Sequence, residues 1–197
     1  MSETRSYPRH VKTDAGDIEV RLMSRADEAA VLAFAQALPT HDLLFLPRNI
    51  SQPKVLSAWI SEIERGAITS ILAVGGGRVV GCGTLVRDPH SWSPHVGEIR
   101  MVVASEVRGQ GVGRALSQET FALALSAGLE KLTVQMTVDQ SAAIALFESL
   151  GFRAEALLRD HVRDVDGKTH DIVVLGHNIA QVQAQLEAYG VPGAVQH

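Results

Sequence analysis

The 197-residue chain has few or none of the features that mark several protein classes. Its single cysteine, Cys82, excludes an internal disulfide and a zinc site built on several thiolates. It has no run of eighteen apolar residues, so we expect no transmembrane helix. Its polar start also lacks the apolar segment of a secretory signal. Together these absences favour a reducing, cytoplasmic location and no membrane partner.

The chain also lacks an excess of basic residues. Lysine and arginine number 18 against 22 aspartates and glutamates, which gives a net charge of −4. Proteins that bind nucleic acids usually carry a basic face, so we expect no nucleic-acid partner. Hydrophobic residues make up 46% and charged residues 20%, which is typical of a folded globular domain of this length.

The pattern of apolar residues, glycines and prolines predicts an α/β (α+β) domain with a mixed sheet. Residues 1–17 form a polar tail, or part of a hairpin that reaches residue 22. A main domain over 18–178 and a C-terminal helix and tail over 179–197 follow. We expect helices over 25–38, 53–65, 111–128, 141–150 and 180–189. We expect strands over 18–22, 69–74, 79–86, 96–103, 132–138, 156–164 and 168–176.

The most informative segment runs from the strand ending at Val103 through a glycine-rich turn into a helix. Backbone N–H groups at a helix start, aided by the helix dipole, bind anions. Glycines at 109, 111 and 113 would let the main chain approach a phosphate closely, with Arg108 and Arg114 at either side. The alternative is a tight turn that binds nothing.

The spacing of this turn argues against two common phosphate-binding motifs. A Walker loop ends in Gly-Lys-Ser/Thr, whereas this turn ends in Gly113-Arg114-Ala115. The dinucleotide fingerprint needs a third glycine or alanine where this chain has Arg114. Neither a nucleoside triphosphate nor a dinucleotide is therefore favoured.

The turn resembles the pyrophosphate-binding signature of the GNAT superfamily of acyl-CoA-dependent N-acyltransferases. That signature is Arg or Gln, two residues, Gly, one residue, then Gly or Ala, and Arg108, Gly111 and Gly113 match it. A second family motif resembles the stretch from Gln140 to Phe152. The resemblance covers about residues 18–178.

The resemblance implies a mostly antiparallel central sheet, flanked by helices and splayed between the family's fourth and fifth strands. It also implies acetyl-CoA as co-substrate, with the pantetheine arm pairing with the splayed strand near Met101–Val103. The residues implied in coenzyme binding are Met101, Val102, Val103, Arg108, Gly109, Gln110, Gly111, Val112, Gly113, Arg114, Gln140 and Phe147.

Glu98 is the candidate general base, because many family members carry a glutamate in this strand and an ammonium must lose a proton before it attacks. The alternatives are that Glu98 pairs with Arg100 on the same strand face or is simply solvated. The family often uses a tyrosine to reprotonate the leaving thiolate, but Phe147 stands there and has no proton to give. The general acid is therefore not identified.

Other reactive side chains carry weaker signals. Cys82 lies in an expected strand between two glycines, and a small buried thiol is the favoured interpretation over a nucleophile. The eight histidines show no spacing of a known zinc site, so we expect no metal.

The resemblance implies that acceptor specificity comes from the loop between the first two helices and from the last hairpin. Candidate acceptor residues are His41, Asp42, Phe45, Arg48, Trp92 and the stretch 159–171. For the apolar residues of that loop, packing onto the core is the favoured interpretation.

The overall hypothesis is an N-acetyltransferase that acts on a primary amine of a small molecule or amino acid. One alternative is an acyl-CoA-binding regulatory module without turnover; another is a protein N-terminal or lysine acetyltransferase. The apolar face of the last helix could serve a homodimer or pack on its own sheet.

Overall fold

A computed structural model describes residues 6–180 of the chain. Within this range eight strands form one sheet in the order β1-β2-β3-β4-β5-β6-β8-β7. Only β5 and β6 run parallel; the other neighbours are antiparallel, as predicted for a mixed, mostly antiparallel sheet. The strands are β1 Arg9–Thr13, β2 Gly16–Leu22, β3 Ile68–Gly75, β4 Arg78–Arg87, β5 Val96–Val103, β6 Lys131–Thr137, β7 Arg153–Arg163 and β8 Thr169–Asn178.

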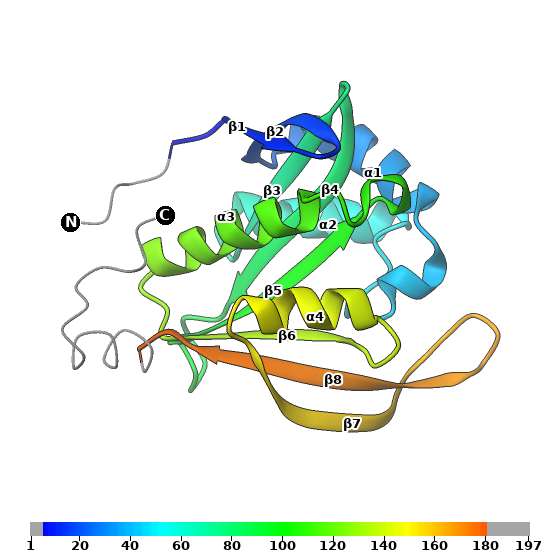
Figure 1. Cartoon of the computed structure of the whole chain (residues 1–197), viewed down its shortest axis with the longest axis vertical. Helices are drawn as coiled ribbons and strands as arrows, with labels where there is room; N and C mark the ends of the chain where they lie inside the picture. Colours follow the sequence, from blue (N-terminus) through cyan, green and yellow to red (C-terminus); the bar gives the residue numbers. More distant parts are fainter. Residues whose placement is uncertain (1–5, 181–197) are drawn as a thin grey trace.

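Helices cover both faces of this sheet. In Figure 1, α3 (Val112–Ser126) and α4 (Ser141–Ser149) lie in front of the sheet, and α1 (Glu28–Ala37) and α2 (Pro53–Glu64) lie behind it. Pro53 opens α2 at a position where its missing N–H has no intrahelical partner to lose. None of the helices within residues 6–180 is long and apolar enough to span a membrane.

Separate apolar clusters fill the two faces. Phe34 of α1 and Leu56 and Ile60 of α2 pack with Leu72 on the back of the sheet. On the front, α3 packs directly against the backbone of β4. A Cβ at Gly81 would lie 2.7 Å from Leu116 Cδ1, and one at Gly83 would lie 2.7 Å from Thr120 Oγ1. This close approach fixes the start of α3 relative to the end of β5.

The first two strands form a hairpin, which is one of the two alternatives expected for this segment. Its register runs from Arg9 opposite Val20 to Thr13 opposite Gly16, and β2 then pairs with β3. The hairpin therefore extends the main sheet. The predicted helix over 180–189, and the homodimer face assigned to it, fall almost wholly outside the described residues.

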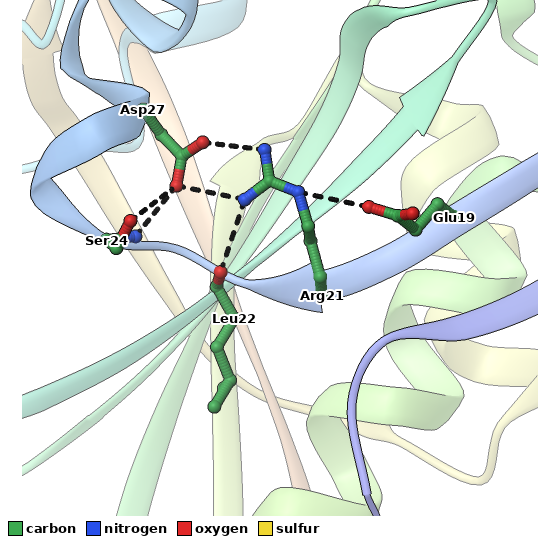
Figure 2. A network of polar contacts seen from close by, with 5 residues as sticks. All are labelled: Glu19, Arg21, Leu22, Ser24 and Asp27. Carbon is green, nitrogen blue, oxygen red and sulfur yellow. Dashed lines mark hydrogen bonds and ion pairs between the residues drawn. The ribbon is translucent and has the colours of Figure 1, made fainter.

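A polar network joins β2 to the start of α1 (Figure 2). The Arg21 guanidinium donates to both carboxylate oxygens of Asp27, at 2.6 and 3.0 Å, and contacts Glu19 at 3.1 Å. The Asp27 carboxylate also accepts a hydrogen bond from the backbone N–H of Ser24 at 2.9 Å. This hydrogen bond holds residues 25–27 in a 3-10 turn. The sequence predicted a helix from residue 25, whereas α1 begins at Glu28. Hydrogen bonding from Arg21 lowers the pKa of Asp27.

Candidate active site

The sheet opens between β5 and β6. The two strands pair over four residues, from Val96 opposite Lys131 to Ile99 opposite Val134. Beyond Ile99 they diverge, while β5 stays paired with β4 as far as Val103 (Figure 1). The backbone of residues 100–103 therefore has no strand partner on its β6 side, which leaves N–H and C=O groups able to bind an extended ligand.

A pocket of about 310 Å³, called here the splay pocket, lies at this opening. Its wall is made by the ends of β5 and β6, the glycine turn, the start of α4 and the connection between α1 and α2. The lining residues are Asp42, Phe45, Met101, Val102, Val103, Arg108, Gly109, Gly113, Val134, Gln135, Met136, Asp139, Gln140, Ser141, Ala142, Ala143, Leu146 and Phe147.

The glycine turn presents the start of α3 to this pocket. Gly111 caps the helix in the left-handed region, with φ +89°, and Gly109 also has a positive φ of +71°. Residues with a Cβ adopt this conformation at a cost of about 1–2 kcal/mol, so glycine suits both positions. The turn is held from outside by the hairpin, where the Asp14 N–H donates to the Gln110 carbonyl at 3.0 Å. The first N–H groups of α3 have no intrahelical partner, which is the arrangement that favours an anion at a helix start.

Eight of the twelve predicted coenzyme residues line the splay pocket: Met101, Val102, Val103, Arg108, Gly109, Gly113, Gln140 and Phe147. The other four do not line it. The Val112 side chain is fully buried in the core, and the Gln110 amide donates to the Glu106 carbonyl. Arg114 reaches Ser149 of α4 at 3.4 Å, and Gly111 contributes the cap. A role in coenzyme binding stays a prediction for all twelve residues.

Arg108 links two loops at the pocket. Its guanidinium donates to the Val103 carbonyl at 3.1 and 3.2 Å and pairs with Asp42 at 2.6 Å. Asp42 belongs to the 3-10 turn η2 (Thr40–Leu43), which sequence reasoning assigned to the acceptor side. The pair places this turn directly against the coenzyme motif.

Glu98 and Arg100 form an ion pair on one face of β5. Arg100 Nε lies 2.8 Å from Glu98 Oε1, and Arg100 Nη2 lies 3.1 Å from Oε2. The pairing considered as one alternative for Glu98 is therefore present. A carboxylate has lone pairs for further hydrogen bonds, so the pairing leaves the predicted role as base untested.

A second pocket of about 370 Å³, called here the α2 pocket, lies on the face of the sheet covered by α2. It is lined by residues of α2, β4, β5 and the segment before α2, and it shares Met101 and Val102 with the splay pocket. Arg100 lines it, so the Glu98–Arg100 pair adjoins it. The two pockets thus meet along the unpaired part of β5.

Comparison with known proteins identifies the family of the chain. The family model described as Acetyltransferase (GNAT) family matches residues 35–152, which is more than half of the chain. The chain belongs to the GNAT acetyltransferase family. Members of this family are acyl-CoA-dependent acyltransferases that use acetyl-CoA and act on amine acceptors.

Individual relatives are distant. Probable N-acetyltransferase family 8 member 5 of Mus musculus is 34% identical over 84 residues, which are 42% of this chain and only 37% of that protein. N-alpha-acetyltransferase 30 of Schizosaccharomyces pombe is 25% identical over 123 residues, 61% of this chain and 82% of that protein. The structure of yncA, a putative acetyltransferase from Salmonella typhimurium with its cofactor acetyl-CoA, superposes with a TM-score of 0.69. It shares 19% identity and covers 82% of this chain and 94% of that one.

Two side chains in this GNAT site have clear structural roles. Phe147 is buried and packs edge-on against Phe152, with ring centroids 5.2 Å apart. Cys82 is also buried, and burial raises the pKa of its thiol to about 12. The burial of Cys82 agrees with the interpretation of a small buried thiol, and a thiol with a raised pKa is a weak nucleophile at neutral pH.

The predicted acceptor residues separate in the structure. Arg48 lines the α2 pocket, whereas Asp42 and Phe45 line the splay pocket. Leu43 is buried, as favoured for the apolar part of this loop. Trp92 is fully exposed and lines neither pocket. The stretch 159–171 forms the end of the β7–β8 hairpin.

Sequence reasoning named Gln140 and Phe147 on the α4 side of the splay pocket but missed other lining residues of β6 and α4, including Gln135, Met136, Asp139 and Ser141. Asp139 and Ser141 flank Gln140, so the second motif marked their place without marking their role. Apart from Arg48 and the two shared residues Met101 and Val102, the α2 pocket had no sequence signal as a binding site. Its other residues come from several segments between 46 and 102, which only the fold brings together.

Proposed function

We propose that this protein transfers the acetyl group of acetyl-CoA to a primary amine of a small molecule or amino acid by direct attack. The observation that carries the proposal is the meeting of two pockets at Met101 and Val102. One pocket has the GNAT coenzyme motif in its wall, and the other leaves room for an acceptor. A transferase that uses direct attack needs both substrates in contact with one short segment.

The splay pocket supports the coenzyme half of this proposal. Pantetheine would pair with residues 100–103 of β5, which have no strand partner on the β6 side. The pyrophosphate would lie at the N–H groups of the first turn of α3, beside Gly109 and Gly113. In this position the thioester would face the shared residues Met101 and Val102.

The charge of the α2 pocket supports an acceptor that carries an acidic group in addition to its amine. Arg48 and Arg87 line this pocket, and neither guanidinium has a hydrogen bond or ion pair with another residue in the described part of the chain. Guanidinium groups bind carboxylates and phosphates through paired hydrogen bonds. An amino acid has such a group.

Glu98 would accept the proton of the incoming ammonium, directly or through one water, because its carboxylate adjoins the α2 pocket through Arg100. The free amine then attacks the thioester carbonyl carbon. A C–N bond forms as the C–S bond breaks, the nitrogen releases a second proton to solvent as it becomes an amide, and the leaving thiolate takes up one proton. Phe147 cannot supply that proton, so solvent or a pocket hydroxyl such as that of Ser141 would supply it.

The test is an assay of released CoA thiol with a panel of amines. Each amino acid is compared with its carboxamide, which keeps the amine and removes the acidic group. Turnover of amino acids with a higher KM for the carboxamides supports the proposal. Acetyl-CoA binding without thiol release for any amine or peptide would favour a regulatory module, and turnover of peptides alone would favour a protein acetyltransferase.

A further inference from the structure

Two histidines and an aspartate from distant parts of the chain meet beside the splay pocket. His41 lies in η2, Asp139 follows β6, and His170 lies on β8. One nitrogen or oxygen atom from each residue lies within 4.8 Å of one from each of the others. Asp139 also lines the splay pocket, so the cluster faces the coenzyme site.

His41 is held against both other members of the cluster. Its Nε2 lies 2.9 Å from Asp139 Oδ2 and 3.5 Å from the Thr137 hydroxyl. Its ring meets the His170 ring edge-on, with centroids 5.1 Å apart. The two imidazoles therefore share one small volume.

His170 is oriented by a carboxylate that is itself fixed. Its Nε2 lies 2.7 Å from Asp164 Oδ2, and Asp164 Oδ1 accepts the backbone N–H groups of Asp166 and Lys168 at 3.0 and 2.9 Å. When Nε2 donates its hydrogen to Asp164, Nδ1 keeps the lone pair that a metal ion needs. A carboxylate that fixes a histidine in this way is typical of metal-binding histidines.

The two carboxylates of this region pair only with histidines among the basic residues within 6–180. Asp139 lies against His41, and Asp164 lies against His170. Within residues 6–180 no lysine or arginine pairs with either of them. A cation is therefore favoured at this position.

We propose that His41, Asp139 and His170 form a binding site for a divalent transition-metal ion such as Zn²⁺. Two imidazoles and one carboxylate suit Zn²⁺ and its neighbours, whereas Mg²⁺ and Ca²⁺ prefer oxygen ligands alone. The side chains of His41 and Asp139 are 36% and 59% exposed, so an ion could enter from solvent and keep coordination positions open toward the pocket. The ion would join η2, the end of β6 and β8.

The main rival is an acceptor ammonium group held by the two carboxylates. An ammonium group binds carboxylates without needing imidazole lone pairs, whereas a metal ion needs them. Replacing the histidines while leaving the carboxylates in place therefore separates the two.

The experiment uses the full chain, freed of metal by a chelator and of any affinity tag. Zn²⁺ affinity is measured by competition with a chromogenic chelator, without any acetyl-transfer assay. His41→Ala and His170→Ala remove one imidazole each, and Asp139→Asn removes the charge with little change of shape. His90→Ala, in the exposed loop before β5, is the matched control.

We expect one Zn²⁺ per chain in the wild type and in His90→Ala. Each of the three cluster variants should lower the affinity at least about tenfold. Zn²⁺ should also raise the melting temperature of the wild type and of His90→Ala only, because an ion that binds the folded state stabilises it. Circular dichroism without metal checks that each variant is folded. No stoichiometric binding, or equal binding by folded His41→Ala and His170→Ala, would overturn the proposal.

Discussion

Strand β5 has two neighbours in the sheet and pairs with them to different extents. With β4 it pairs from Gly97 to Val103. With β6 it pairs only from Val96 to Ile99. The β4 side is continuous sheet covered by α3, whereas the β6 side opens after four residues into the splay pocket.

Under the proposed function, one strand serves as both scaffold and binding surface. The pairing with β4 fixes the position of residues 100–103, so that their free edge is rigid before a ligand arrives. Preorganisation of this kind reduces the entropy lost on binding. Variants on the open side should therefore change binding or turnover with little effect on stability, and variants of the scaffold should do the reverse.

The largest effect is expected from Glu98→Gln. Loss of a general base lowers kcat roughly 100- to 10,000-fold. Acetyl-CoA affinity, measured by calorimetry, should stay close to that of the wild type, because Glu98 is not among the residues that line the splay pocket.

Arg100→Gln is the control for this variant, because it breaks the same ion pair and keeps the carboxylate. A base role predicts a much smaller loss of kcat in Arg100→Gln than in Glu98→Gln. Equal losses would show that Glu98 acts only through its pairing with Arg100.

Gly111→Glu should weaken acetyl-CoA binding by about 100-fold or more. The residue has a φ of +89°, which a glutamate adopts only with strain, and the added charge would repel phosphate. Gly128→Glu is the matched control, since Gly128 has a φ of +70° just after the other end of α3. If both variants bind acetyl-CoA like the wild type, the glycine turn does not bind the coenzyme.

Asp27→Asn tests the scaffold. Removing the carboxylate leaves the Arg21 guanidinium without its main partner, and we expect a loss of about 2 kcal/mol in the free energy of unfolding. Because the folded-state pKa of Asp27 is lowered, its contribution is present above the unfolded-state pKa and is lost as the pH falls through the folded-state value.

Urea unfolding at several pH values checks this expectation. The wild-type stability should fall more steeply below about pH 4 than that of the variant. An unchanged acetyl-CoA affinity would support the separation between scaffold and binding surface, and a large change would contradict it.

Arg48→Gln and Arg87→Gln should have the smallest effect. Each removes one guanidinium from the α2 pocket, so the KM for an acidic acceptor should rise about tenfold while the KM for its carboxamide stays nearly constant. Initial rates with matched acceptor pairs measure this difference. Equal changes for both acceptors would argue against an acidic group on the substrate.

The sequence predicted the parts of this site that are local in the chain. The turn from Val103 into α3 depends on glycines at fixed spacing, and the start of α4 follows a recognisable motif. The splay between β5 and β6 was implied by the family resemblance, and the four-residue pairing confirms it. These features need only short-range patterns or a known motif.

The contacts that the sequence did not predict join distant segments. Arg108 and Asp42 lie on separate loops, and their pairing depends on how α1 and α2 pack on the sheet. His41, Asp139 and His170 come from three different elements, so no spacing rule could detect their convergence. Hydrophobic periodicity places a residue on a face of its element, but it does not specify which other element that face will meet.

The Arg108–Asp42 pair has a thermodynamic consequence. It connects the turn before α3 with η2, so ordering one loop reduces the conformational entropy that remains to be lost by the other. Linkage makes this coupling reciprocal: the free energy by which one loop favours the other is the same in both directions. If ligand binding orders either loop, the affinities of two ligands that contact these loops become mutually dependent through this ion pair.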